Sequence, residues 1–178
     1  MKHLPNILTM MRILLIPFFI YYFINESLMI AFTIFMVASV TDFFDGYLAR
    51  KYQVISNFGK IMDPLADKLL VLSALALLSF GKHGYLSMWI FIIITLREVL
   101  ITILRDIYKK KKIILAANNW GKIKTALQMV GLTVSFFLLG INFRLTNYVL
   151  YLNLYFWVVV IVTLLSGASY FKNIKELL

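Results

Sequence analysis

The 178-residue chain is far more apolar than a soluble domain: 62% of its residues are hydrophobic, 15% are charged, and the mean hydropathy is +0.87. Soluble domains have about 45–50% apolar and about 25% charged residues, so the composition excludes an ordinary soluble domain and a disordered chain. The absence of cysteine excludes thiol chemistry and a disulfide scaffold. A net charge of +10 suits either nucleic-acid binding or basic residues that flank membrane spans.

Six apolar stretches follow one another along the chain, and each is long enough to cross about 30 Å of hydrocarbon as a helix. The first begins like a signal peptide, but it lacks a small-residue cleavage site and Asn25-Glu26 leads directly into the next stretch, so we expect it to be retained. We predict an all-α integral membrane protein with a single domain over residues 1–178. Its six transmembrane helices are expected at Leu8–Ile24, Leu28–Ala49, Ile61–Phe80, Tyr85–Leu104, Ile123–Ile141 and Tyr148–Tyr170.

The basic residues lie almost entirely at one end of these predicted helices. The short turns after the first, third and fifth stretches contain only Lys82 and Arg144, and the other sixteen of the 18 Lys and Arg residues lie at the opposite ends. By the positive-inside rule that end faces the cytoplasm, so we predict that both termini are cytoplasmic. The charge is then explained without nucleic acid. The run Lys109–Lys112 is expected to attract anionic headgroups rather than to act in catalysis.

Four of the eight acidic residues lie at the adjoining ends of the second and third predicted helices. Asp42 and Asp45 are three apart and Asp63 and Asp67 are four apart, so each pair lies on one helical face. Carboxylates in membrane spans are costly and by default indicate a functional site. An all-oxygen ligand set favours Mg²⁺ or Mn²⁺ over Zn²⁺. The alternative is that the aspartates form surface ion pairs with Arg50, Lys51, Lys60 and Lys68. Such ion pairs would leave the shared helical faces unexplained.

Small residues lie on the same helical faces as the carboxylates. Gly46 and Ala49 follow Asp42 at i+4 and i+7, and Gly59 precedes Asp63 by four residues. They leave room for a ligand against the helix backbone, although small residues also serve helix packing in membranes.

The complete segment reads Asp42-Phe-Phe-Asp45-Gly46-Tyr-Leu-Ala49-Arg50, eight further residues, and Gly59-Lys-Ile-Met-Asp63-Pro-Leu-Ala-Asp67. It matches the signature D-x2-D-G-x2-A-R-x8-G-x3-D-x3-D at every position and resembles the CDP-alcohol phosphotransferase family. The resemblance implies a six-helix membrane fold, an active site facing the cytoplasm of a bacterial cell membrane, two divalent cations (Mg²⁺ or Mn²⁺) and a homodimer.

Within this family the chain most resembles bacterial members that transfer the phosphatidyl group of CDP-diacylglycerol to glycerol 3-phosphate, which releases CMP. The resemblance rests on four shorter motifs: Pro5-Asn6-Ile-Leu-Thr9-x2-Arg12, Asp63-Pro64-Leu-Ala-Asp67-Lys68, Arg97-Glu98 with Arg105, and Gly121-Lys122-Ile-Lys124-Thr125. Members of the cardiolipin synthase type share several of them. A different acceptor, such as phosphatidylglycerol or inositol phosphate, therefore stays open.

The resemblance also implies roles for individual residues. The four aspartates would bind the metals, and Asp67 would be the catalytic base that takes the proton of the attacking hydroxyl. Asn6 and Thr9 are expected either to contact CDP or to cap the first helix, and Arg50 either to contact a phosphate or to anchor its helix at the interface. The full set of expected CDP contacts is Asn6, Thr9, Arg12, Asp42, Gly46, Ala49, Arg50 and Gly59.

The acceptor carries a dianionic phosphate and needs basic partners. Arg97 and Arg105 are eight residues apart, about two turns, and so share a side of the fourth helix. An arginine inside an apolar run is costly unless paired, and we expect Glu98 to point elsewhere on the helix. The expected partners of the acceptor phosphate are Arg97, Arg105, Lys122, Lys124 and Thr125.

A divalent-cation transporter is the alternative from a different functional class. Transporters bind their ions near the bilayer midplane, often between repeated halves. Here the carboxylates lie at the ends of two neighbouring helices and no internal repeat is visible, which favours the transferase.

Overall fold

A computed structural model describes residues 4–51, 57–82, 84–110, 119–143 and 147–177, and the side chains of 7–42, 59, 62–82, 84–108, 120–143 and 147–168. Within these residues the chain forms helices and no strands, which confirms the all-helical prediction. The six helices are α1 Leu4–Ile24, α2 Leu28–Lys51, α3 Asn57–Phe80, α4 Met88–Lys110, α5 Asn119–Gly140 and α6 Tyr148–Leu177.

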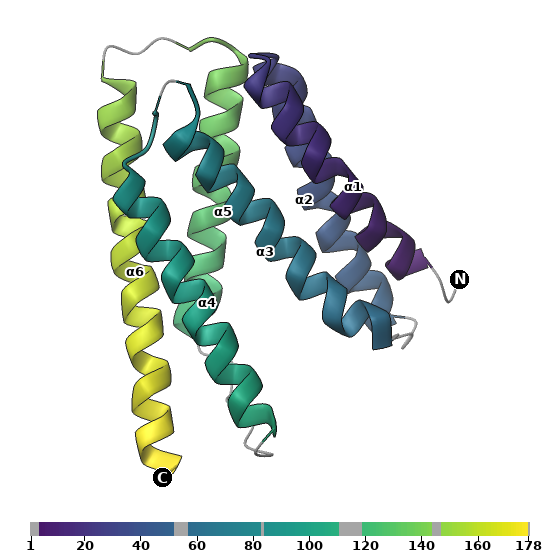
Figure 1. Cartoon of the computed structure of the whole chain (residues 1–178), viewed down its shortest axis with the longest axis vertical. Coiled ribbons are helices and arrows are strands. Elements are labelled where there is room, and N and C mark those ends of the chain that lie inside the picture. Colours follow the sequence, from purple (N-terminus) through teal and green to yellow (C-terminus); the bar gives the residue numbers. More distant parts are fainter. Residues whose placement is uncertain (1–3, 52–56, 83, 111–118, 144–146, 178) are drawn as a thin grey trace.

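The helices alternate in direction, so the turns after α1, α3 and α5 gather at one end (Figure 1). We call this the turn end and the other the open end. Helix α1 packs against α2, α5 packs against both α2 and α6, and α4 packs against α6. Helix α3 is central, since it contacts α1, α2, α4 and α5. The expected contact between the second and third helices is confirmed, and both carry their aspartates toward the open end (Figure 1).

The helix boundaries differ from the apolar stretches by a few residues. Helix α4 begins at Met88 rather than Tyr85 because the preceding backbone is bonded elsewhere: Leu86 N–H donates to the Leu78 carbonyl (2.9 Å) and Ser87 N–H to Asn153 Oδ1 (2.8 Å). Helix α6 continues to Leu177, beyond the predicted Tyr170. Hydropathy delimits the part of a helix that suits hydrocarbon, whereas the backbone hydrogen-bond ladder continues into polar sequence.

Two turns at the turn end share one geometry. Glu26 (φ 59°) and Asn142 (φ 52°) adopt the left-handed conformation after α1 and α5. In the first turn, Glu26 N–H donates to the Phe23 carbonyl and Ser27 N–H to the Tyr22 carbonyl, which is the Schellman pattern that satisfies the last carbonyls of a helix. Lys82 Nζ donates to Glu26 Oε1 (2.5 Å) and so links two turns. This hydrogen bond and the Glu26 charge raise the pKa of the Lys82 ammonium.

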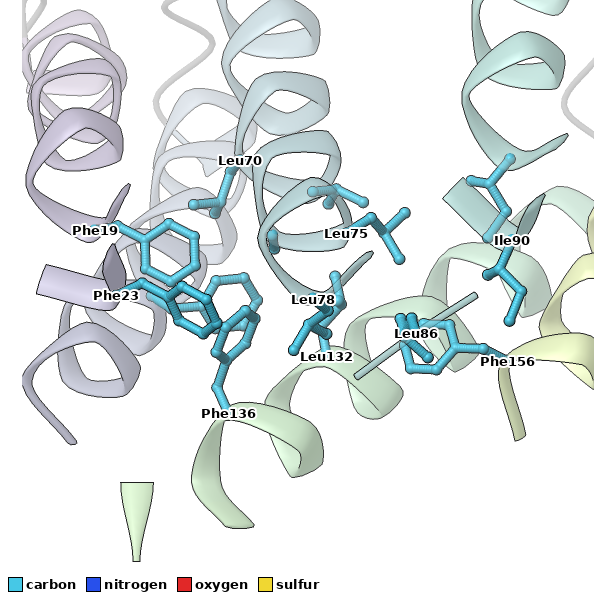
Figure 2. Packing of buried hydrophobic residues seen from close by; sticks show 14 of the residues in the cluster. Phe19, Phe23, Leu70, Leu75, Leu78, Leu86, Ile90, Leu132, Phe136 and Phe156 are labelled. Carbon is cyan, nitrogen blue, oxygen red and sulfur yellow. The ribbon is translucent and has the colours of Figure 1, made fainter. Parts of the chain in front are cut away.

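The buried core joins all six helices, and its aromatic part lies where α1, α2 and α5 meet (Figure 2). The Phe136 ring packs against Phe19 (centroids 5.1 Å apart), Phe35 (5.3 Å) and Phe23 (5.6 Å). Near-perpendicular pairs, such as Phe19 with Phe136 at 79°, are a favourable geometry for aromatic rings. Phe19 and Phe23 belong to the second half of α1, so this packing anchors α1 near the turn end and leaves its first half to polar contacts.

The outer surface is strongly apolar, as a lipid-facing surface requires. Leu14, Ile24 and Trp89 are each more than 60% exposed, in company with many other large apolar side chains. Three described segments are long and apolar enough to cross a membrane: Ile7–Ile24, Trp120–Gly140 and Tyr148–Ala168. Helix α2 has a shorter apolar stretch, Leu28–Asp42, and charged residues interrupt the apolar sequence of α3 and α4.

Candidate active site

Helix α1 directs two polar side chains at the aspartates of α2 and α3. Thr9 and Arg12 are both fully buried, and three residues apart they lie on one face of the helix. Thr9 Oγ1 donates to Asp63 Oδ1 (2.5 Å), and Arg12 Nη1 forms an ion pair with Asp42 Oδ1 (2.6 Å). One aspartate from each half of the motif is therefore oriented by α1.

These contacts decide one alternative that the sequence left open, the role of Thr9. Thr9 lies inside α1, more than one turn after Leu4, and bonds to Asp63 on α3, so it does not cap the helix. Asn6 also lies within α1, but its side chain is outside the described residues.

Of the four basic residues in the alternative of surface ion pairs, the structure describes the side chain of Lys68 alone, and Lys68 forms no ion pair with the described aspartates. Asp42 pairs with the buried Arg12, which that alternative did not include. Lys68 Nζ donates to Thr102 Oγ1 on α4. The side chains of Arg50, Lys51 and Lys60 lie outside the described residues.

The carboxylates of α2 and α3 are close enough for their charges to interact. Asp42 interacts electrostatically with Asp63, and Asp67 with Asp42. A carboxylate has about four lone-pair sites, so the bonds from Arg12 and Thr9 leave acceptor capacity on Asp42 and Asp63. This donor set consists of oxygens alone and therefore fits a hard divalent cation.

The structure does not describe the side chain of Asp45, the remaining aspartate of the motif. Asp45 lies on α2 with its side chain outside the described residues, as do Gly46, Ala49 and Arg50. Among the side chains that the structure does describe, no three carboxylate, histidine or cysteine groups form a metal-binding cluster. Gly59 is buried, one turn before Asp63 on α3.

A second group of charges lies between α4, α5 and α6. Arg97 Nη1 (2.9 Å) and Lys124 Nζ both donate to Glu98 Oε1, and Arg97 Nη2 donates to Ser166 Oγ on α6 (2.7 Å). We call Arg97, Glu98, Lys124 and Ser166 the Glu98 cluster. Its three charged side chains are between 7% and 15% exposed.

The expectation that Glu98 points away from Arg97 is wrong. Consecutive residues on a helix project about 100° apart, but both side chains are long and bend into the same gap, where Lys124 of α5 provides a second positive charge. A buried carboxylate is stable only when it is paired and hydrogen-bonded, and the pairing with two cations meets that requirement.

The other expected partners of the acceptor phosphate lie nearer the surface. Arg105, Lys122 and Thr125 are exposed. Thr125 Oγ1 donates to the Gly121 carbonyl of its own helix (3.0 Å). The structure thus brings two of the five expected residues into one cluster, the buried Lys124 and the largely buried Arg97 (10% exposed), and leaves three at the surface.

Asp67 interacts with charges of both groups. Its carboxylate interacts electrostatically with Asp42 and Arg12 and also with Lys124 and Glu98. These interactions follow from the central place of α3, which contacts helices of both groups.

Three polar residues of this region make contacts that were not predicted from the sequence. Lys68, next to Asp67, donates to the Thr102 hydroxyl, and that hydroxyl donates to the Glu98 carbonyl (2.6 Å). Ser166 completes the Glu98 cluster. The sequence does contain a pattern that could have indicated Thr102: it follows Glu98 by four residues and therefore lies on the same face of α4.

Comparison with known proteins identifies the family to which this arrangement belongs. A sequence model described as CDP-alcohol phosphatidyltransferase matches residues 2–166. The chain belongs to this family. Family members generally depend on divalent cations, in agreement with the carboxylate set of α2 and α3.

Similar proteins cover nearly the whole chain. The CDP-diacylglycerol–glycerol-3-phosphate 3-phosphatidyltransferase of Rickettsia typhi is 38% identical over 98% of this chain and 98% of its own length. The protein of the same name from Bacillus subtilis is 37% identical over 100% of this chain and 98% of its own length. That from Haemophilus influenzae is 39% identical over 82% of this chain and 78% of its own length.

Proposed function

We propose that the protein transfers the phosphatidyl group of CDP-diacylglycerol to glycerol 3-phosphate, producing phosphatidylglycerol phosphate and CMP for phospholipid biosynthesis. The names of relatives that align over nearly the whole chain support this activity. The observation that carries it is that α3, which holds Asp63 and Asp67, contacts the helices of a carboxylate group (α1 and α2) and those of a cationic group (α4 and α5). A transferase of this kind needs both, one for a metal-bound pyrophosphate and one for an acceptor phosphate.

We propose further that all six helices span a bacterial cytoplasmic membrane, with both termini and the active site at the cytoplasmic face. The sequence supports this orientation, because sixteen of the 18 Lys and Arg residues lie outside the turns that follow the first, third and fifth apolar stretches. The apolar outer surface and the three long apolar segments support the membrane setting.

The donor side comprises α1, α2 and α3. Asp42, Asp45, Asp63 and Asp67 would hold two divalent cations, Mg²⁺ or Mn²⁺, which when bound supply positive charge to the pyrophosphate. Arg12 and Thr9 hold Asp42 and Asp63 in place. The CDP group would lie against α2 and α3 beside Asp42, where its further contacts are Asn6, Thr9, Arg12, Gly46, Ala49, Arg50 and Gly59.

Asp67 is proposed as the general base. It accepts the proton of the glycerol 3-phosphate hydroxyl as the oxygen of that hydroxyl bonds to the phosphorus that carries diacylglycerol. The bond from this phosphorus to the oxygen of CMP breaks, and CMP leaves with the electron pair. Such transfers depend on in-line positioning more than on covalent catalysis, and a site between donor and acceptor groups provides it.

The acceptor side is proposed to receive the phosphate of glycerol 3-phosphate at Arg97 and Lys124. Arg97 Nε is buried and has no hydrogen-bond partner, and the Lys124 ammonium has three N–H donors, of which Glu98 takes one. These remaining donors suit phosphate oxygens. The exposed Arg105, Lys122 and Thr125 would guide the anion toward them.

Purified protein incubated with CDP-diacylglycerol and labelled acceptors tests the activity. We expect product from glycerol 3-phosphate, and none from phosphatidylglycerol or inositol phosphate. Preference for either of these would favour the alternative family activities, and cation uptake into vesicles without any transfer would favour the transporter.

Asp67→Asn tests the proposed base. We expect this variant to lose turnover while it still binds CDP-diacylglycerol, because the amide cannot accept the proton. Near-normal turnover would remove Asp67 from this role. The homodimer that we also propose would be detected by cross-linking in the membrane.

A further inference from the structure

The Glu98 carboxylate has no part in the chemistry proposed above, although it lies in the middle of the acceptor side. It is 15% exposed, and its Oε1 atom accepts hydrogen bonds from both Arg97 and Lys124. A buried carboxylate is costly unless it is fully paired. Here the ion pairs with Arg97 and Lys124 offset the cost of burying the Glu98 carboxylate, and the carboxylate in turn holds these two cations close to each other.

The separation of these two cations is not determined by direct helix packing. In the described parts of the chain, the α4 and α5 backbones do not pack against each other; each contacts α3 and α6 instead. Arg97 and Lys124 therefore lie on helices whose spacing is set only indirectly. Glu98 joins them directly, because one oxygen atom receives a donor from each helix.

The geometry of this bridge suits a phosphate group. Two nitrogens that donate to one oxygen lie within about 6 Å of each other, a spacing at which both can also reach oxygens of one phosphate. The second arm of Arg97 is held by Ser166, and its Nε–H stays unpaired. Glu98 thus orients both cations without using up their donors.

We propose that Glu98 is a positioning residue for the acceptor: its carboxylate holds Arg97 and Lys124 at the separation that receives the phosphate of glycerol 3-phosphate. This inference rests on the proposed function, since it needs the acceptor phosphate to bind these two residues. Without the carboxylate, the two positive charges repel each other across the gap between α4 and α5.

Steady-state kinetics of Glu98→Gln test the proposal. We expect the KM for glycerol 3-phosphate to rise about tenfold or more, as for the loss of a hydrogen bond between charged groups, while the KM for CDP-diacylglycerol stays within about twofold. A residue that merely stabilises the fold would shift both KM values and lower the unfolding temperature. Asp106→Asn is the matched control, because Asp106 lies two turns further along α4 and is exposed; it should leave both KM values unchanged.

A double-mutant cycle separates positioning from a direct effect. If Glu98 acts through Lys124, Glu98→Gln should add less than about twofold to the KM for glycerol 3-phosphate in a Lys124→Met background. Full additivity would overturn the proposal, as would equal effects of Glu98→Gln on both substrates or no effect on either. If Glu98→Gln does not fold, Glu98→Asp keeps the charge on a shorter arm, and it should raise the same KM at least about threefold; an unchanged KM would overturn the proposal.

Different results would contradict the proposed function and the positioning role of Glu98. The proposed function is wrong if the unmodified protein makes no phosphatidylglycerol phosphate from glycerol 3-phosphate. The positioning role fails if the unmodified protein is active and the variants leave the KM for glycerol 3-phosphate unchanged.

Discussion

Replacing Thr9 by valine removes a single hydroxyl from the donor side and keeps the shape of the side chain. Thr9 is fully buried, and its hydroxyl donates to Asp63 at 2.5 Å. A hydrogen bond to a charged group contributes about 1.5–3 kcal/mol. Because Asp63 is only half-buried, the lower end applies, and about 1.4 kcal/mol corresponds to a tenfold change in an equilibrium or a rate.

We therefore expect Thr9→Val to lower kcat/KM for CDP-diacylglycerol about tenfold. If the hydroxyl acts by orienting Asp63, the divalent-cation concentration that gives half-maximal activity should also rise. The assay is CMP release in mixed micelles over a range of Mg²⁺ concentrations. Thr9→Ser is the matched control, since it keeps the hydroxyl, and it should stay within about threefold of the unmodified protein.

Two outcomes would refute this reasoning. Equal activity of the valine and serine variants would show that the hydrogen bond to Asp63 does not matter for the reaction. A loss of activity in Thr9→Val with an unchanged metal requirement would show that Thr9 acts through its contact with the nucleotide and not through the orientation of Asp63.

Three further predictions concern packing, the connection between α3 and α4, and the metal. Gly131→Ala should destabilise the protein by about 1–3 kcal/mol, because its new Cβ would lie 2.4 Å from Tyr155 Cε1. In the control Gly167→Ala, the atoms nearest to the new Cβ lie at 3.7 Å, so the unfolding temperature should stay unchanged or rise slightly. Thr102→Val removes the acceptor of the Lys68 bond and the donor to the Glu98 carbonyl; activity should fall about threefold to tenfold, and a level equal to that of Thr102→Ser would argue against the connection. Chelation with EDTA should abolish transfer and added Mg²⁺ or Mn²⁺ should restore it; activity that survives EDTA would rule out the metal-dependent mechanism.

The sequence by itself determined the fold class, the helix count and the donor-side motif. Hydropathy marks each helix locally, and the described residues form six helices that overlap the six predicted stretches. The fixed spacing of the eight signature residues from Asp42 to Asp67 indicated the family, which the comparison confirmed. Both signals are contained in short stretches of sequence, so no knowledge of long-range contacts is needed to read them.

The partners of the charged side chains were decided only by the tertiary structure. Thr9 reads equally well as a helix cap or a nucleotide contact until α1 is placed against α3. The pairing of Arg12 with Asp42 likewise needs α1 to be placed against α2. The direction of Glu98 depends on Lys124, which is 26 residues away on α5, a helix whose described backbone does not pack against that of α4. A long side chain has several rotamers within reach of different partners, and the position of the opposite charge selects one of them, which local sequence does not contain.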